Sequence, residues 1–367
     1  MSTTRRPVQV DSGVVFGGGA FGTCLAMLLT RNGAKKVRVW HPFAEEVDKM
    51  NKSCMNEKYL PSVQLAPEIE FTADVKTALS TNSPVLAFAI PTQHVRTFLR
   101  KNKPMLESAM ERSKIVFIAC KGIETSTLAF PLRIFEEELG RAVHSKFAVV
   151  AGPSFAIEVA ESKLTHVSVA ARDLGVARYG QEVLSTFDGS FRCFAARDVM
   201  ACEVASAMKN VLAIASGAAQ GLGLGRNARA LIITRGLIEI VLLADALTGK
   251  SGSLPAILSL AGVGDIVLTC TSSKSRNFSV GVRIGKGERI ADIQKSMTAV
   301  AEGVATADAL EKLAKKAGVK LPLCEAVFSV LQGRTTCKDA MDVLTDPKKT
   351  GLSDEPLAHW VASPSKL

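Results

Sequence analysis

Two groups of residues in this sequence have types and spacings that could do chemistry. The first is a glycine run near the start, and its six members are Gly17, Gly18, Gly19, Ala20, Phe21 and Gly22, in the pattern G-x-G-x-x-G. Between a strand and a helix, such glycines allow a tight turn, close approach of a pyrophosphate, and close helix–strand packing. The helix N-terminus adds positive potential. The run therefore predicts a dinucleotide site that uses all six residues.

The residues after the second expected strand leave the choice of dinucleotide open. Folds that bind NAD usually place an acidic residue there to hold a ribose hydroxyl and repel a 2′-phosphate. In this sequence Trp40 is followed by His41 and Pro42. From these residues alone, both NAD and NADP remain possible.

The second group centres on Lys209, in an apolar stretch of helical periodicity. Its neighbours three and four positions away are Ala205, Ser206, Leu212 and Ala213, so no carboxylate on the same helix can pair with it. Lys209 therefore either lies along the surface with its ammonium in solvent or lines a cleft as a proton donor. Asp265, an isolated acid in an apolar, glycine-bounded segment, is its natural partner, although it could equally cap a helix.

Several further polar positions fit a phosphorylated ligand. Ser275-Arg276-Asn277 combines a guanidinium fork with an amide, which suits a phosphate, although alone it reads as an ordinary polar turn. Pro91, Lys121 and Ser154 each follow an expected strand. Taken singly each is a surface loop, but the carboxyl ends of parallel strands meet at one edge, where ligands bind.

The elements that must position these residues differ between the two halves. Short β-branched runs alternate with helical stretches up to about residue 196, and a further pair of strands is expected at 166–170 and 190–195. Beyond Asp198, apolar residues recur at helical spacing. We predict a Rossmann-type α/β domain with a mostly parallel sheet at 1–196, then an all-α substrate domain at 197–367 that ends in a tail after about 335.

Composition excludes several classes of protein. The 367 residues are 47% hydrophobic and 22% charged, as in ordinary folded domains, and the net charge of +10 is spread along the chain. With 5% aromatic residues and no basic arm, nucleic-acid binding is not expected. The eight cysteines and five histidines lack metal-ligand spacing. The uncharged stretch 12–30 contains five glycines, so we expect no membrane span.

The chain stops at Ser365-Lys366-Leu367. At an extreme C-terminus this tripeptide is read by the peroxisomal import receptor. We therefore expect that receptor as a partner and import into an organelle of the peroxisome type.

Together the motifs resemble NAD(P)-dependent glycerol-3-phosphate dehydrogenases from the glycine run to about residue 335. With the terminal tripeptide, the resemblance is to the glycosomal branch of kinetoplastid protists. Besides the glycine run, the matching segments are Tyr59-Leu60-Pro61, Lys121-Gly122-Ile123-Glu124, Ala151-Gly152-Pro153-Ser154-Phe155-Ala156, Ala207-Met208-Lys209-Asn210-Val211, Gly264-Asp265 through Thr271, Ser275-Arg276-Asn277 and Ala301-Glu302-Gly303-Val304.

The resemblance implies reversible reduction of dihydroxyacetone phosphate to sn-glycerol 3-phosphate in the glycosome, with NAD as cofactor and a homodimer as the assembly. Lys209 would be the general acid and base, Asp265 would hold it, and Lys121 would polarise the same substrate oxygen. The implied substrate-binding residues are Ser154, Asn210, Thr269, Ser275, Arg276 and Asn277. The implied cofactor contacts beyond the glycine run are Pro91, Lys121, Ala156, Arg276 and Glu302.

Two other functions are weighed against this one. A hydroxyacid or 6-phosphogluconate dehydrogenase would share the two-domain layout and the lysine chemistry, but lacks support from Asp265 and Arg276-Asn277. A protein that senses NAD without turnover would account for the missing acid after Trp40. Tight NADH binding with no oxidation by any phosphorylated ketone would favour the sensor.

Overall fold

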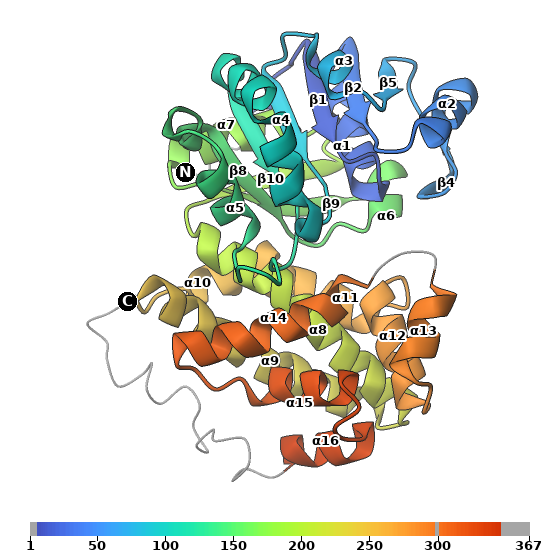
Figure 1. Cartoon of the computed structure of the whole chain (residues 1–367), viewed down its shortest axis with the longest axis vertical. Coiled ribbons are helices and arrows are strands. Elements are labelled where there is room, and N and C mark those ends of the chain that lie inside the picture. Colours follow the sequence, from blue (N-terminus) through green and yellow to red (C-terminus); the bar gives the residue numbers. More distant parts are fainter. Residues whose placement is uncertain (1–5, 298–300, 346–367) are drawn as a thin grey trace. The chain divides into compact units, whose positions relative to one another are not determined.

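The computed structural model describes residues 6–297 and 301–345, which form two compact units (Figure 1). The first unit comprises the described residues up to Lys121 together with Pro131–Val199. The second comprises Gly122–Phe130 and the described residues from Met200 onward. The short segment Gly122–Phe130 thus leaves the first unit and places Ile123 and Phe130 in the core of the second.

The first unit is built on an eight-stranded sheet, in the order β10-β9-β8-β7-β6-β1-β2-β5. All neighbouring strands run parallel except β8 and β9, which are antiparallel, so the expected mostly parallel sheet is confirmed. The strands are β1 (Ser12–Phe16), β2 (Lys36–Trp40), β5 (Ile69–Thr72), β6 (Val85–Phe88), β7 (Ile115–Ile118), β8 (Phe147–Ala151), β9 (Thr165–Ala170) and β10 (Phe191–Ala196).

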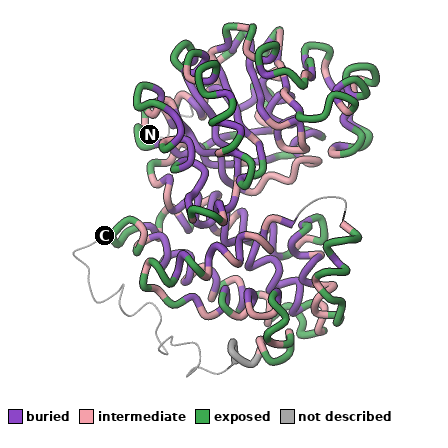
Figure 2. The backbone as a smooth tube through the Cα atoms, viewed as in Figure 1, coloured by how far each residue is buried: buried purple, intermediate pink, exposed green. Residues whose placement is uncertain are grey.

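Helices cover this sheet, and its central strands are buried along their whole length (Figure 2). Burial on both faces explains why these strands are continuous apolar runs in the sequence. The helices are α1 (Ala20–Arg31), α2 (Ala44–Ser53), α3 (Val75–Leu79), α4 (Thr92–Arg112), α5 (Pro131–Glu138), α6 (Ala156–Ala160) and α7 (Leu174–Leu184), with a 3₁₀ turn at Arg141–Lys146.

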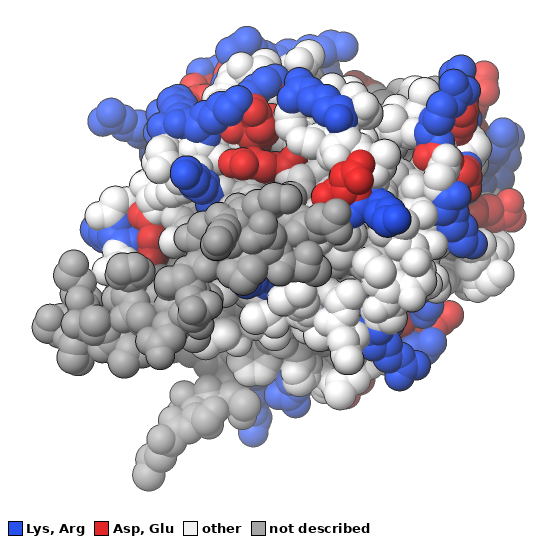
Figure 3. All heavy atoms as spheres, turned by 90° about the horizontal axis from the view of Figure 1, so that it is seen from below, with Lys and Arg blue, Asp and Glu red and all other residues white. Residues whose placement is uncertain are grey.

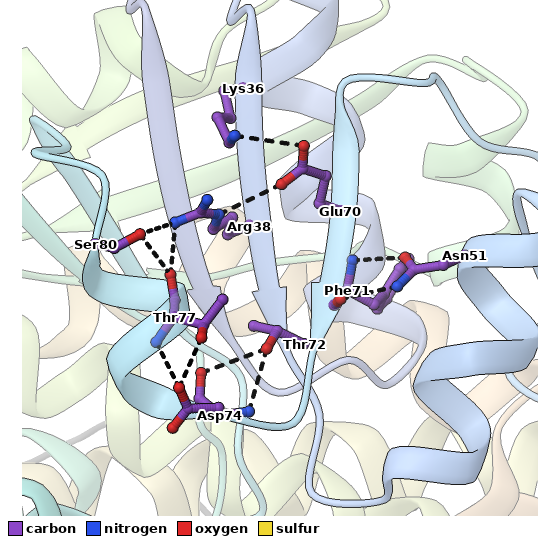
Figure 4. A network of polar contacts seen from close by, with 9 residues as sticks. All are labelled: Lys36, Arg38, Asn51, Glu70, Phe71, Thr72, Asp74, Thr77 and Ser80. Atoms are coloured by element: carbon purple, nitrogen blue, oxygen red, sulfur yellow. Dashed lines mark hydrogen bonds and ion pairs between the residues drawn. The ribbon is translucent and has the colours of Figure 1, made fainter.

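The sequence did not predict three short strands near the β2 edge. They are β5 and the antiparallel hairpin β3 (Met55–Asn56) and β4 (Leu60–Gln64). β5 is short and alternates buried with exposed residues, so it lacks the apolar run that marks the central strands. It pairs with β2 through a parallel backbone ladder, and the carboxylate of Glu70 also lies 3.4 Å from both Lys36 and Arg38 (Figure 4).

From Met200 onward, the described part of the second unit is mostly helical, as expected. Its helices are α8 (Val199–Gly221), α9 (Gly225–Thr248), α10 (Leu254–Ile257), α11 (Asp265–Thr271), α12 (Arg276–Gly285), α13 (Ile290–Ser296), α14 (Glu302–Ala317), α15 (Pro322–Leu331) and α16 (Cys337–Thr345). Helix α16 corrects the expectation of a tail from about 335, because Met341 packs against the helical core. The terminal Ser365-Lys366-Leu367 lies outside the described residues.

A buried carboxylate joins α9 to α15 in this unit. Glu239 accepts hydrogen bonds from the backbone N–H groups of Leu323 (2.6 Å) and Cys324 (3.1 Å), in the first turn of α15. Burial raises the pKa of Glu239 to about 7. The partial positive charge of the helix N-terminus opposes that rise, and the carboxylate in turn satisfies donors that the helix itself cannot.

The charges on the molecular surface are mixed in sign. On the face seen in Figure 3, Lys and Arg side chains lie beside Asp and Glu side chains. Local pairs of this kind in the second unit include Arg283 with Glu288 (2.6 Å) and Lys312 with Asp308 (2.6 Å). Each such pair is locally neutral.

Helix α8 is the central element of the second unit. Among the described residues it is the one helix long and apolar enough to cross a membrane, but 94% of its apolar window is buried inside the protein. Its backbone packs directly against that of α12. A Cβ on Gly217 would lie only 2.0 Å from the carbonyl oxygen of Phe278, so no side chain fits there. A Cβ on Gly281 would lie 2.0 Å from the carbonyl oxygen of Ile214. Glycines thus fix the distance between two helices that carry candidate site residues.

This contact predicts the effect of one methyl group. Gly281→Ala should lower the free energy of unfolding by about 1–3 kcal/mol, because a backbone carbonyl cannot move aside as a side chain can. Chemical denaturation measures the loss. The matched control is Gly19→Ala, whose new methyl group meets nothing within 4 Å. Equal stability of the two variants would contradict the account of the α8–α12 contact.

Candidate active site

The glycine run forms the turn between β1 and α1, and its glycines differ in how closely other atoms approach them. Gly17 has φ +113°, and a Cβ there would lie 2.5 Å from the carbonyl oxygen of Ala89. A Cβ on Gly22 would lie 1.8 Å from the carbonyl oxygen of Gly17. A Cβ on Gly19 would meet nothing within 4 Å. Gly17 and Gly22 are therefore required by the fold, whereas Gly19 leaves the backbone open to a ligand.

The hydrogen bonds of this turn identify the donors that remain for a ligand. The N–H groups of Gly17 and Gly18 donate to the carbonyl of Trp40, at 3.0 and 3.1 Å, and the first helical bond runs from Thr23 to Gly19. The N–H groups at the start of α1 have no partner within the helix. Helix α1 carries no acidic residue in its first turn. The turn therefore fits the pyrophosphate of a dinucleotide.

A carboxylate lies near the end of β2 although the sequence after Trp40 contains none. His41 is buried, and its Nε2 lies 3.3 Å from Oε2 of Glu46 on α2. Burial lowers the pKa of His41 below its usual value. A carboxylate at this edge is typical of folds that bind NAD, and here the ammonium of Lys58 lies 2.5 Å from its Oε1. Sequence reasoning missed Glu46 because it comes from the following helix.

The other predicted residues of the first unit follow β6, β7 and β8, which are the next three strands on one side of β1 in the sheet. Pro91 precedes α4, and the hydroxyl of Thr92 donates to the carbonyl of Lys121 at 2.6 Å. The Nζ of Lys121 lies 5.8 Å from the ring centre of Phe21. The structure therefore brings Lys121 to the glycine turn.

The loop after β8 is tied to both its own backbone and α1. The hydroxyl of Ser154 donates to the carbonyl of Gly152 at 3.1 Å. Ala156 begins α6, and its carbonyl accepts a hydrogen bond from the thiol of Cys24 at 3.1 Å. Arg31, at the end of α1, donates to the carbonyl of Val159 at 2.8 Å. Helix α1 thus positions both the glycine turn and the start of α6.

In the second unit, Lys209 on α8 and Asp265 on α11 form a buried ion pair. Nζ of Lys209 lies 2.5 Å from Oδ1 of Asp265, and the two residues are 7% and 1% exposed. The hydroxyl of Thr269 lies 3.4 Å from the same Nζ and donates to the carbonyl of Asp265 at 2.6 Å. The suggested partnership is therefore present, and Asp265 holds an ammonium away from bulk water.

The turn before α11 gives Asp265 its place. Residues Leu260–Gly264 form a short π-helical turn, and a Cβ on Gly262 would lie 1.9 Å from the carbonyl oxygen of Ile257. On the other side, Ser216 of α8 donates to the carbonyl of Cys270 at 2.7 Å. Burial raises the pKa of the Cys270 thiol to about 12, so it stays neutral beside the ion pair.

The predicted phosphate-binding segment is the N-terminus of α12. The hydroxyl of Ser275 accepts a hydrogen bond from the N–H of Phe278 and so caps the helix, while Arg276 is exposed. Oδ1 of Asn277 accepts a hydrogen bond from the N–H of Gly303 at 3.0 Å. That contact leaves the Nδ2 donor of Asn277 for other partners.

Gly303 lies against two predicted residues, Asn210 and Asn277, although the sequence assigned a role only to its neighbour Glu302. A Cβ on Gly303 would lie 2.7 Å from the carbonyl oxygen of Asn210 and 2.8 Å from Oδ1 of Asn277. Glu302 is the first residue of α14. The close approach therefore brings α8, α12 and the start of α14 together, a relation that no local sequence pattern carries.

Among the residues that the structure describes, no group of three or more His, Cys, Asp or Glu side chains could hold a metal ion.

A pyrophosphate turn on a parallel sheet and a buried lysine–carboxylate pair on a helical core define a dinucleotide-dependent dehydrogenase. The family model for the N-terminus of NAD-dependent glycerol-3-phosphate dehydrogenase matches residues 13–177. The model for its C-terminus matches residues 198–342. This chain belongs to the NAD-dependent glycerol-3-phosphate dehydrogenase family.

Individual relatives agree with the family match. The chain is 49% identical over 365 residues to the glycosomal glycerol-3-phosphate dehydrogenase [NAD(+)] of Leishmania mexicana, covering 98% of this chain and 97% of that protein. It is 40% identical to glycerol-3-phosphate dehydrogenase [NAD(P)+] of Hyphomonas neptunium, with coverages of 90% and 94%. The crystal structure of the Coxiella burnetii glycerol-3-phosphate dehydrogenase superposes with a TM-score of 0.82 at 30% identity, covering 92% of this chain and 99% of that one.

The glycine turn predicts a substitution that separates binding from folding. Gly19→Ala should raise the Kd for NADH at least about tenfold, because its methyl group occupies the space that a pyrophosphate needs. Its thermal midpoint should match that of the unchanged protein, because nothing in the protein contacts that methyl. NADH fluorescence titration measures the Kd. Unchanged NADH affinity would show that the pyrophosphate does not approach Gly19.

Proposed function

We propose that this chain interconverts dihydroxyacetone phosphate and sn-glycerol 3-phosphate with NAD(H), as its family membership implies. The buried Lys209–Asp265 pair is the single observation that carries this proposal. A ketone cannot accept a hydride without charge developing on its oxygen, and a positioned ammonium can neutralise that charge. The family match sets aside both the hydroxyacid or 6-phosphogluconate dehydrogenase and the NAD sensor.

We propose that the glycine turn holds the cofactor, with Pro91, Ala156, Arg276 and Glu302 as further contacts. When bound, the cofactor would supply the hydride that reduces the substrate's second carbon and would accept it in the reverse direction. The backbone N–H groups at the start of α1 bind the pyrophosphate. His41 and Glu46 line the edge where the ribose hydroxyls are recognised in such folds.

We propose that Lys209 is the catalytic acid and base. In the reduction its ammonium donates one proton to the substrate oxygen as the C–O double bond becomes a single bond. Asp265 keeps the ammonium oriented, because its Oδ1 lies 2.5 Å from Nζ of Lys209. In the oxidation Lys209 takes the proton back from the hydroxyl. Lys121 is proposed to polarise the same oxygen.

The substrate's phosphate and hydroxyl groups need donors as well as charge. Arg276 offers a bidentate fork, and Nδ2 of Asn277 is directed by the bond from Gly303 to Oδ1 of the same side chain. Ser154, Asn210, Thr269 and Ser275 are the remaining proposed contacts. The hydroxyl oxygen of Ser275 already accepts a hydrogen bond as the helix cap. Ser275 therefore contributes to substrate binding through its hydroxyl hydrogen or its backbone.

The proposed function is tested by following NADH absorbance. Dihydroxyacetone phosphate should oxidise NADH rapidly, and unphosphorylated dihydroxyacetone should oxidise little of it. Only the phosphorylated ketone carries the group that the Arg276 and Asn277 donors would bind. The same assay with NADPH in place of NADH tests the choice of cofactor. No oxidation of either coenzyme by the phosphorylated ketone would contradict the proposal.

Lys209 is the residue whose removal is most informative. Lys209→Ala should lower kcat by a factor of at least about 10², the usual contribution of a positioned acid. The Kd for NADH should change less than about twofold, since no cofactor contact is lost. Steady-state kinetics and NADH titration give the two values. Near-normal turnover would remove Lys209 from the catalytic role.

We also propose that the protein is imported into glycosomes. The support is the terminal Ser365-Lys366-Leu367 and the word glycosomal in the names of the Leishmania mexicana and Trypanosoma brucei relatives. The import receptor is the partner that this tripeptide implies. A homodimer is proposed as the assembly. Light scattering tests this assembly state.

Removal of Leu367 tests the import proposal. The truncated protein should keep its NADH-linked activity and remain in the cytosol, because the receptor reads the complete terminal tripeptide. Fractionation of cells that express the two forms measures the distribution. Continued organelle import of the truncated form would refute the assignment of the signal to this tripeptide.

A further inference from the structure

The β3–β4 hairpin carries the segment Tyr59-Leu60-Pro61, to which the proposed function gives no role. This hairpin lies outside the eight-stranded sheet, yet it contacts the glycine turn. The contact is made by Asn56, the second residue of β3, which is 1% exposed. Asn56 is thus a buried amide whose placement needs an explanation.

Both amide hydrogens of Asn56 have acceptors. Nδ2 lies 3.0 Å from the carbonyl oxygen of Gly18 and 2.8 Å from the hydroxyl of Thr23. Thr23 is itself fully buried in the second turn of α1. A primary amide has two N–H donors, so one side chain joins the turn and the helix that follows it.

The bond to Gly18 sets the direction of the next N–H group. In a trans peptide the C=O of one residue and the N–H of the next point in opposite directions. With the Gly18 carbonyl held toward Asn56, the N–H of Gly19 points away from Asn56. Gly19 is the residue beside which a Cβ would meet nothing within 4 Å. The N–H therefore belongs to the part of the turn that is open to a ligand.

Something must fix this peptide, because glycines flank it on both sides. Gly18 and Gly19 have no Cβ, so rotation of the peptide between them meets little steric resistance. The N–H groups of Gly17 and Gly18 are held by the carbonyl of Trp40. The Gly18–Gly19 peptide is the next one along the chain, and Asn56 holds its carbonyl.

The hairpin gives Asn56 a rigid base. Leu60 pairs with Asn56 across the hairpin and is buried in the core of the first unit. The N–H of Tyr59 donates to the carbonyl of Asn56 at 3.1 Å. The Tyr59-Leu60-Pro61 segment is thus the part of the hairpin that fixes the backbone of Asn56.

We propose that Asn56 is a positioning residue for the dinucleotide, holding the Gly18–Gly19 peptide so that the N–H of Gly19 faces the pyrophosphate. The proposal rests on the proposed function, since it requires a pyrophosphate at the glycine turn. Asn56 itself does not touch the ligand. Loss of its side chain frees the Gly18–Gly19 peptide, so the affinity for NADH falls while the chemical step is unchanged.

Two variants of the full chain test this, with NADH as the probe. Asn56→Ala removes the restraint and should raise the Kd for NADH about tenfold. Asn56→Asp should raise it further, because a carboxylate repels the Gly18 carbonyl and accepts a hydrogen bond from the Gly19 N–H once the peptide turns over. In both variants the KM for NADH should rise, while kcat and the KM for dihydroxyacetone phosphate stay within about twofold.

Asn32 provides the matched control. It lies at the other end of α1, is fully buried, and donates both amide hydrogens to backbone carbonyls, of Val183 at 2.8 Å and Ser185 at 2.7 Å. Asn32→Ala should lower the thermal midpoint, while its Kd for NADH, measured well below that midpoint, stays unchanged. A purely structural role for Asn56 would give the two alanine variants the same pattern.

The results separate this proposal from the proposed function. An Asn56→Ala or Asn56→Asp protein that binds NADH as tightly as the unchanged chain overturns the proposal, and so does an equal loss in Asn32→Ala. An unchanged chain that binds NADH but does not oxidise it with dihydroxyacetone phosphate contradicts the function, while the binding comparison still decides the role of Asn56. An unchanged chain that does not bind NADH overturns both.

Discussion

A buried ion pair is the constraint on which the second unit depends. Taking an ammonium and a carboxylate out of water is costly, and their attraction repays that cost only with close geometry and further hydrogen bonds. Lys209 and Asp265 meet this condition at 2.5 Å, with the hydroxyl of Thr269 beside them. Their helices must therefore be placed within narrow limits. The glycines of α8 and α12 and the tight turn at Gly262 provide that placement.

The glycine turn of the first unit also depends on the close approach of backbones. Gly17 and Gly22 have no room for a side chain, so β1, β6 and α1 come together and the N-terminus of α1 faces outward. An anion can then be bound by backbone dipoles alone, without a charged side chain. In one unit glycine thus leaves backbone donors accessible, and in the other it allows the close helix packing around a buried ion pair.

The sequence was sufficient for the features that local patterns encode. The parallel strands, the glycine turn and the helical second half follow from apolar runs and spacing. The pairing of Lys209 with Asp265 was open from the residues, because 56 positions separate them. Glu46, Gly303 and Asn56 could not be assigned, since each acts through a contact between distant segments. Helix α16 was missed because its polar residues resemble those of a tail, although Met341 packs into the core.

The central claim is that Lys209 supplies the proton, and not only a positive charge. Chemical rescue of Lys209→Ala tests this claim most directly, with methylammonium as a small proton donor and tetramethylammonium as a cation that has no proton to give. The account predicts that turnover with dihydroxyacetone phosphate rises with methylammonium concentration and does not rise with tetramethylammonium. Equal rescue by both cations, or no rescue by methylammonium, would contradict it.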